Sequence, residues 1–167
     1  MATKKDETKP AEKIEELNLD QKVTLKSIAD WETGFARIAD GSGDVRIMPR
    51  GTVRLSRNEI IAQVQNGNAL IGGVDGLGSH ATLYIDDKPT RIEVGFEDDK
   101  KTQLMFTDDL ITELFKIKDQ DKFVEAFSQS IVTRAEKKAA IRAISEMRLN
   151  DYNKIRFIEE YTGYKVN

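Results

Sequence analysis

The spacing of apolar residues changes once along this chain, near Thr107, and this change constrains the fold more than any other feature. Before it, apolar and polar residues mostly alternate, as in KVTLKSI from Lys22, a pattern typical of β-strands. After it, apolar residues recur every three or four positions, as on one face of a helix. The sequence therefore predicts an α+β protein, with a β-rich domain over residues 21–106 and a helical domain over residues 107–167.

The β-rich domain is expected to contain about seven short strands joined by tight turns. Turn signals at Asp40-Gly41-Ser42-Gly43 and Pro49-Arg50-Gly51 separate the early strands. The extended segments expected after KVTLKSI are GFARIAD, DVRIM, TVRL, NALIG, HATLYID, TRIEVGF and TQLMF. Because no helical crossovers separate most of them, they favour a small antiparallel β-barrel or sandwich over a parallel sheet.

One helix is expected to be inserted between these strands. Ser56-Arg57-Asn58-Glu59 fits a capping box, in which the serine side chain accepts an amide hydrogen bond and the glutamate reaches back. Ile60, Ile61 and Val64 then share one helical face, and Gly67 suits the left-handed position that ends a helix.

Four helices are expected after Thr107, packed as a small bundle. Residues that can cap a first turn stand at Thr107, Thr133 and Asp151, and Phe123, Phe127 and Ile131 mark the second helix. The last helix is predicted to present Tyr152, Ile155, Ile158 and Tyr161. Phe157 lies off that stripe, which leaves two interpretations: a single bundle core, or a helix that also docks on a neighbouring protein.

Residues 1–20 are predicted to form a flexible charged arm. They are rich in Lys, Glu, Asp and Thr and lack aromatic residues, so they cannot bury enough apolar surface to offset the entropy lost on ordering. The same residues lack the apolar core of a secretory signal. No apolar run approaches the roughly 20 residues needed to cross a bilayer, so a soluble protein made in a cytoplasm is expected.

The chain has no cysteine and one histidine, which limits the chemistry available to it. Disulfides, thiolate metal sites and a cysteine nucleophile are excluded. Ser79 precedes His80, but neighbours in a strand point to opposite faces, so the pair is badly placed for proton transfer. An enzyme would need a hidden site built around His80 and Asp75. We predict no catalytic residue, no metal site and no cofactor.

The glycine-rich stretch GGVDGLGSH, residues 72–80, is the leading candidate for contact with a partner. A phosphate-binding loop would need a following helix and a lysine, whereas here a strand is expected to follow. Glycine-rich tips on a β scaffold suit contacts with other proteins. The predicted partner-binding residues are Gly73, Asp75, Gly76, Gly78 and His80 in this stretch, with Arg50, Tyr161 and Tyr164 outside it.

Two groups of basic residues supply an alternative, a nucleic-acid-associated protein. The net charge of -3 gives no overall attraction to nucleic acid, so any contact would be local. The groups are Arg46, Arg50, Arg54 and Arg57, and Arg134, Lys137, Lys138, Arg142 and Arg148. Neither group has interleaved exposed aromatic residues, and ion pairs with acidic partners, including copies of the same chain, are the other interpretation.

Two blocks of the sequence resemble small structural or accessory proteins of tailed bacteriophages. They are VTLKSIADWETGFARI…GDVRIMPRGTVRLSRNEIIAQVQNGNALIGGVDGLGSHATLYIDD and the closing LNDYNKIRFIEEYTGYKV. The resemblance implies a non-enzymatic virion component, capsid-decorating, head-associated or of the connector type, that works in many copies. Its implied partners are phage capsid, portal or neck proteins and copies of itself, without a membrane.

Overall fold

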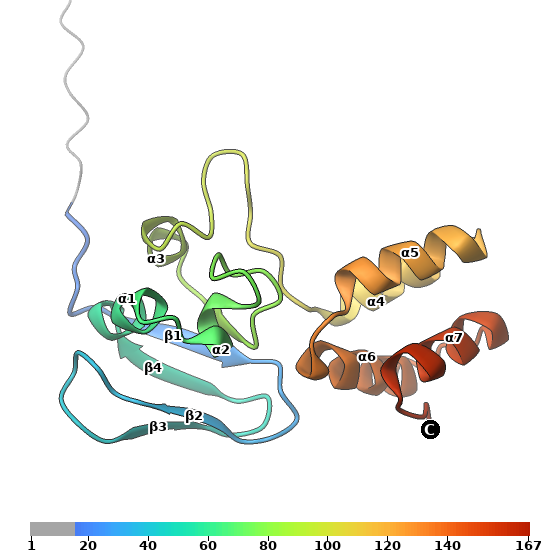
Figure 1. The fold of residues 1–167 in the computed structure, drawn as a ribbon, viewed down its shortest axis with the longest axis horizontal. Coiled ribbons are helices and arrows are strands. Elements are labelled where there is room, and N and C mark those ends of the chain that lie inside the picture. The colour runs from blue at the N-terminus through green and yellow to red at the C-terminus, as the bar shows by residue number, and fades with distance from the viewer. Residues whose placement is uncertain (1–15) are drawn as a thin grey trace, which may run out of the picture.

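The computed structural model describes residues 16–167, so most of the predicted arm lies outside the described residues. The elements are β1 (Lys22–Ser27), β2 (Thr33–Ala36), β3 (Asp44–Ile47), β4 (Thr52–Ser56), α1 (Arg57–Gln65), α2 (Ala69–Gly72), β5 (Leu83–Ile85), α3 (Lys88–Glu93), α4 (Asp108–Phe115), α5 (Gln120–Ser130), α6 (Arg134–Glu146) and α7 (Tyr152–Thr162). Figure 1 shows the strands and α1–α3 on one side and α4–α7 on the other. The predicted α+β class is confirmed.

The strands form two small antiparallel sheets that share one core. In the first sheet the strand order is β4-β1-β5, and Leu25 at its centre lies opposite Val53 on one side and Ile85 on the other. The second sheet pairs β2 with β3. Alternate residues of these strands are buried together in one hydrophobic cluster, which includes Val23, Leu25, Val45, Ile47, Leu55 and Leu83. The alternation of Val23 and Leu25 in β1, and of Leu83 and Ile85 in β5, thus predicted the buried faces of these two strands correctly.

Of the predicted barrel or sandwich with one inserted helix, the closed barrel and the single helix were wrong. Among residues 16–167 the sheets have three and two strands and do not close, and three helices accompany them. NALIG forms α2 because the side chain of Asn68 accepts the amide hydrogen of Leu70 and caps the turn. TRIEVGF lies largely in α3 because Asp87 accepts the amide of Thr90 at 3.0 Å and Pro89 suits a first turn.

The segment TQLMF, expected to be a strand, is in neither a helix nor a strand. The amide of Gln103 donates to the carboxylate of Glu97 at 3.2 Å, rather than to a neighbouring strand. The turn before it is held by Asp98, whose carboxylate accepts the amides of Lys100 and Lys101. In the part of the chain that the structure describes, no strand pairs with TQLMF, so the strand predicted for it does not form.

Glu59 ties α1 to the loop before β3. As predicted, Ser56 accepts the amide of Glu59, but the Glu59 carboxylate does not complete the capping box. It is fully buried and accepts three successive amides, from Ile38, Ala39 and Asp40, at 2.7–2.8 Å. Gln63 donates a further hydrogen bond at 2.8 Å. This buried carboxylate therefore replaces the strand pairing that the loop lacks.

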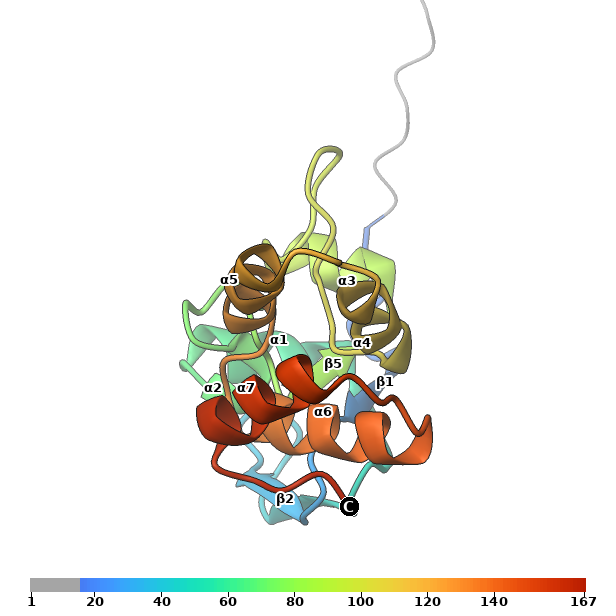
Figure 2. The ribbon, with the colours of Figure 1, turned by 90° about the vertical axis from the view of Figure 1, so that its right-hand side faces the viewer.

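The four C-terminal helices surround a second core, as Figure 2 shows end-on, with α4 and α5 above α6 and α7. The capping box at Thr133 is present, and Asp151 caps α7. The predicted face of α7 needs correction, because Tyr152 is 75% exposed while Phe157 packs edge-on against Phe123 and Phe127. Phe157 therefore belongs to the bundle core.

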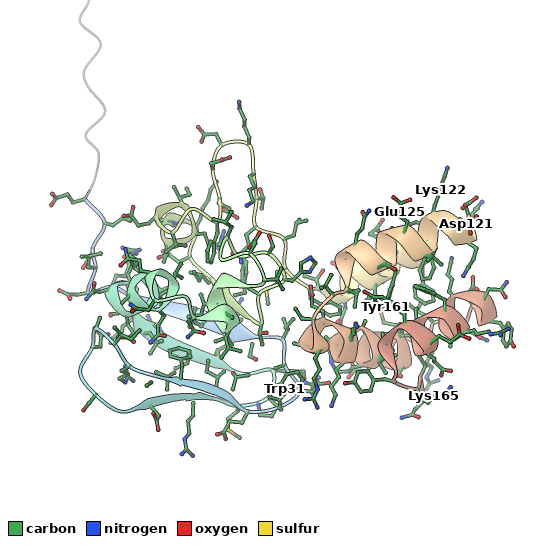
Figure 3. All side chains as sticks on the ribbon, in the orientation of Figure 1. Trp31, Asp121, Lys122, Glu125, Tyr161 and Lys165 are labelled. Carbon is green, nitrogen blue, oxygen red and sulfur yellow. The ribbon has the colours of Figure 1, made fainter. Side chains whose placement is uncertain are left out.

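The connection between β1 and β2 joins the strands to the helices. Ile28 and Ala29 are buried in the helical core, and Trp31 packs against it at the junction visible in Figure 3. The guanidinium of Arg134 lies 5.2 Å from the centre of the Trp31 ring, a cation–π contact. Asp30 adds an ion pair with Arg142 of α6 at 3.8 Å. The two parts are thus packed together through α6.

Substituting Glu59 by Gln is expected to destabilise the fold by about 2–3 kcal/mol near pH 7, because an amide group would face three backbone donors. Burial opposes ionisation of Glu59, but the hydrogen bonds from Gln63, Asp40, Ile38 and Ala39 outweigh it and lower its pKa from the usual 4.5. The stabilisation is therefore present above about pH 4.5 and is lost as the pH falls through the folded-state pKa.

Urea unfolding followed by circular dichroism at several pH values measures this effect. The difference between wild type and Glu59→Gln should shrink on acidification. Glu32→Gln is the matched control, since Glu32 is exposed, and it should change stability by less than about 0.5 kcal/mol. A difference that stays constant from pH 7 to pH 3 contradicts the role given to the charged carboxylate.

Candidate binding site

A cavity of about 450 Å³ lies where the glycine-rich loop, the segment before α4 and the helical bundle meet. Its walls are residues 77–80, residues 101–106, Leu110 of α4, Gln129 and Ser130 at the end of α5, and Glu136 of α6. The cavity thus draws on parts of the chain that are almost 60 residues apart.

Asp75 organises the glycine-rich loop from within. Its carboxylate accepts the amides of Leu77 and Ser79, at 2.8 and 3.2 Å, and the hydroxyl of Ser79 at 2.6 Å. The hydroxyl bond is the main cause that lowers the pKa of Asp75; partial burial acts against it, and the amides add to the lowering. The loop is therefore a closed turn that holds a defined shape without a partner.

Two of the loop glycines are required by close packing. A Cβ at Gly73 would lie 2.0 Å from the carbonyl oxygen of Ser79, with which Gly73 forms a bridge. A Cβ at Gly78 would come within 2.8 Å of both the Phe96 ring and the Gln103 amide nitrogen. Gly76 has a positive φ of 74° but open space around it, so it serves the turn. The glycines position the loop, and its apolar side chains face outward.

His80 connects the loop to α6. Its Nδ1 lies 2.9 and 3.0 Å from the two carboxylate oxygens of Glu136, whose side chain is 6% exposed. Glu136 also accepts the amides of Val132 and Thr133, so one carboxylate caps α6 and holds the loop. The capping-box motif identified Glu136 from the sequence, but nothing in the sequence linked it to His80, 56 residues earlier.

The polar groups around the cavity do not form a proton relay. The Ser79 hydroxyl is directed to Asp75 and the His80 ring to Glu136, and no hydrogen bond joins Ser79 to His80 in residues 16–167. Within the same residues, no cluster of three or more His, Cys, Asp or Glu side chains could hold a metal ion. The geometry offers hydrogen bonding and apolar contact.

Exposed leucines form the rim of the cavity. Leu104 is 86% exposed and Leu77 is 50% exposed, and both line the opening. Gln103 beside Leu104 is buried; its amide nitrogen donates to the Gly78 carbonyl, while its Oε1 has no partner among the described residues. Exposed apolar side chains around a concave surface are typical of protein contact sites. Sequence reasoning missed Leu104, because TQLMF was expected to be a paired strand.

The other predicted contact residues lie away from this cavity. Arg50 is half exposed and 3.8–3.9 Å from the carboxylates of Asp30 and Glu146. Tyr161, labelled in Figure 3, donates its hydroxyl to the Ile131 carbonyl at 2.7 Å, and burial, with the nearby Glu136 charge, raises its pKa. The Tyr164 ring lies 5.4 Å from the Lys138 amine. The structure therefore places Gly73, Asp75, Gly76, Gly78 and His80 in one loop, of which Gly78 and His80 line the cavity, and keeps the other three apart from it.

Most of the basic residues that suggested nucleic-acid binding have partners within the chain. Arg57 is buried and bonded to Asp87, Thr90 and the Asn18 carbonyl. On α6, Lys138 joins Arg134 over the Trp31 ring, and Lys137 lies over the Tyr161 ring. These cations contribute to packing of the protein itself.

Comparisons of the chain with protein-family models, with curated proteins and with solved structures found no match. Across residues 16–167, every helix is too short or too polar to span a membrane.

Substituting Glu136 by Ala is expected to destabilise the protein by about 1–3 kcal/mol, because it removes the Glu136 half of the capping box of α6 and leaves His80 without its partner. Chemical unfolding followed by Trp31 fluorescence measures this loss. Glu125→Ala is the matched control, because Glu125 is an exposed glutamate of α5 and should be neutral to within about 0.5 kcal/mol. Equal effects of the two substitutions would contradict the central role of Glu136.

Proposed function

We propose that this chain is a non-enzymatic structural protein of a tailed-bacteriophage virion that binds neighbouring proteins through the cavity and its rim. The observation that carries the proposal is the pair of exposed leucines, Leu77 and Leu104, placed on ordered loops around a concave surface. The viral setting comes from the sequence resemblance alone. It makes the protein a capsid-decorating, head-associated or connector-type component, with capsid, portal or neck proteins and copies of itself as partners.

The chemistry of the cavity supports contact over catalysis. The two side chains that the sequence offered for a reaction are each bonded to a neighbour that fixes their position: Ser79 to Asp75, and His80 to Glu136. Such internally satisfied loops change little on binding, so a partner does not have to order them first. The apolar rim then supplies the surface that assembly would bury.

Leu77→Asp is expected to reduce incorporation of the protein into particles at least about tenfold, because a charge would be buried at the contact. The measurement is the amount of protein that co-sediments with particles of the phage that encodes it, or with its purified capsid and neck proteins. Ile92→Asp is the matched control: Ile92 is 48% exposed on α3, close to the 50% of Leu77, but lies away from the cavity lining.

Two results would contradict the proposal. One is failure of the wild-type chain to co-sediment with any particle protein, and the other is equal co-sedimentation of Leu77→Asp and Ile92→Asp. Retention that disappears with nuclease, or that falls steeply with salt, would instead favour the nucleic-acid-associated alternative.

A further inference from the structure

The segment that carries Leu104 is self-complementary in charge. Residues 100–109 read KKTQLMFTDD, with two lysines at the start, two aspartates at the end and an uncharged stretch between them. If two copies of this segment run antiparallel about Leu104, Lys100 of each copy faces Asp108 of the other, while Asp99, which precedes the lysines, faces Asp109. The same segments in parallel would place like charges together. The sequence therefore favours one orientation of self-pairing.

The backbone of this segment is free to pair. Within residues 16–167, the amides of Thr102, Leu104, Met105 and Phe106 donate no hydrogen bond to another residue, and the carbonyls of 102–106 accept none. Unpaired backbone of this kind is the template to which another chain adds as a strand. A second copy can supply hydrogen-bond partners for these groups.

Part of the segment is accessible, since Thr102 and Leu104 are exposed, whereas Gln103 and Phe106 are buried. Figures 1 and 2 both show the loop between α3 and α4 projecting from the body of the protein, and its second arm leads down to α4. Leu104 on this arm is the most exposed of the large apolar residues, at 86%. Pairing would bury this side chain against its counterpart, which adds an apolar contribution to the backbone hydrogen bonds.

We propose that two copies of the chain associate by antiparallel pairing of residues 102–106 about a two-fold axis near Leu104. In this arrangement Lys100 of one copy lies close to Asp108 of the other, and the contact is the same from both sides. This pairing names a second copy of the chain as an occupant of the cavity rim. It rests on the proposed function only because both treat the rim as a contact surface.

Sedimentation analysis of the full chain over a range of concentrations tests the pairing. Wild type is expected to form a species of twice the 18.9 kDa chain mass. Lys100→Glu with Lys101→Glu should weaken the dimer by about tenfold or more at low salt, because both ends of the segment become acidic. Lys118→Glu with Lys122→Glu changes the net charge equally on exposed lysines of the helical part, and it should leave the dimer unchanged.

Leu104→Pro is a second variant that does not depend on charge. It removes an amide that has no partner in the folded chain, so the fold should survive, as circular dichroism would verify, while pairing loses a central donor. A wild type that stays monomeric at all concentrations overturns the inference, as does a dimer that neither variant weakens. A monomer that still enters particles at the wild-type level would refute only the pairing, whereas a dimer that enters none would refute the proposed function.

Discussion

The carboxylate of Glu136 is the interaction on which the rest of this structure depends. It is buried at the start of α6, where it accepts the amides of Val132 and Thr133 and faces the ring of His80. A buried carboxylate needs hydrogen-bond donors for its oxygens, so the groups that donate to it are held in fixed positions. In doing so it sets the position of the glycine-rich loop relative to the helical bundle, and the cavity lies between them.

Glu59 plays a similar part in the N-terminal half. Three successive amides of the loop before β3 converge on its carboxylate, and Gln63 closes the arrangement. The sheets are small, and each would be marginal without support from other elements. Buried carboxylates that collect backbone amides therefore compensate for the limited strand pairing. With the loops held in this way, the exposed leucines around the cavity are presented on an ordered surface.

The sequence was informative where a side chain acts on its own neighbours. The capping residues Thr107, Thr133 and Asp151 correctly predicted the starts of three of the four C-terminal helices. The alternation of apolar and polar residues correctly predicted the buried faces of β1 and β5. The prediction from sequence was wrong where a short alternation of apolar residues follows a helix cap. At α3 the alternation predicted a strand, but Asp87 caps the segment and Pro89 suits a first helical turn, so a helix forms. Neither the meeting of His80 with Glu136 nor the exposure of Leu104 could be predicted, because both depend on how distant segments pack.

The central claim is that the surface around the cavity is where this protein contacts others in an assembled particle. Hydrogen–deuterium exchange on the free chain and on the assembled particle measures this most directly. The account predicts rapid exchange of the amides of Leu104 and Met105 in the free chain, and strong protection of residues 72–80 and 101–106 in the particle. Protection confined to other surfaces, such as the end of α7 or the region around Arg50, with unchanged exchange at the cavity rim, would contradict it.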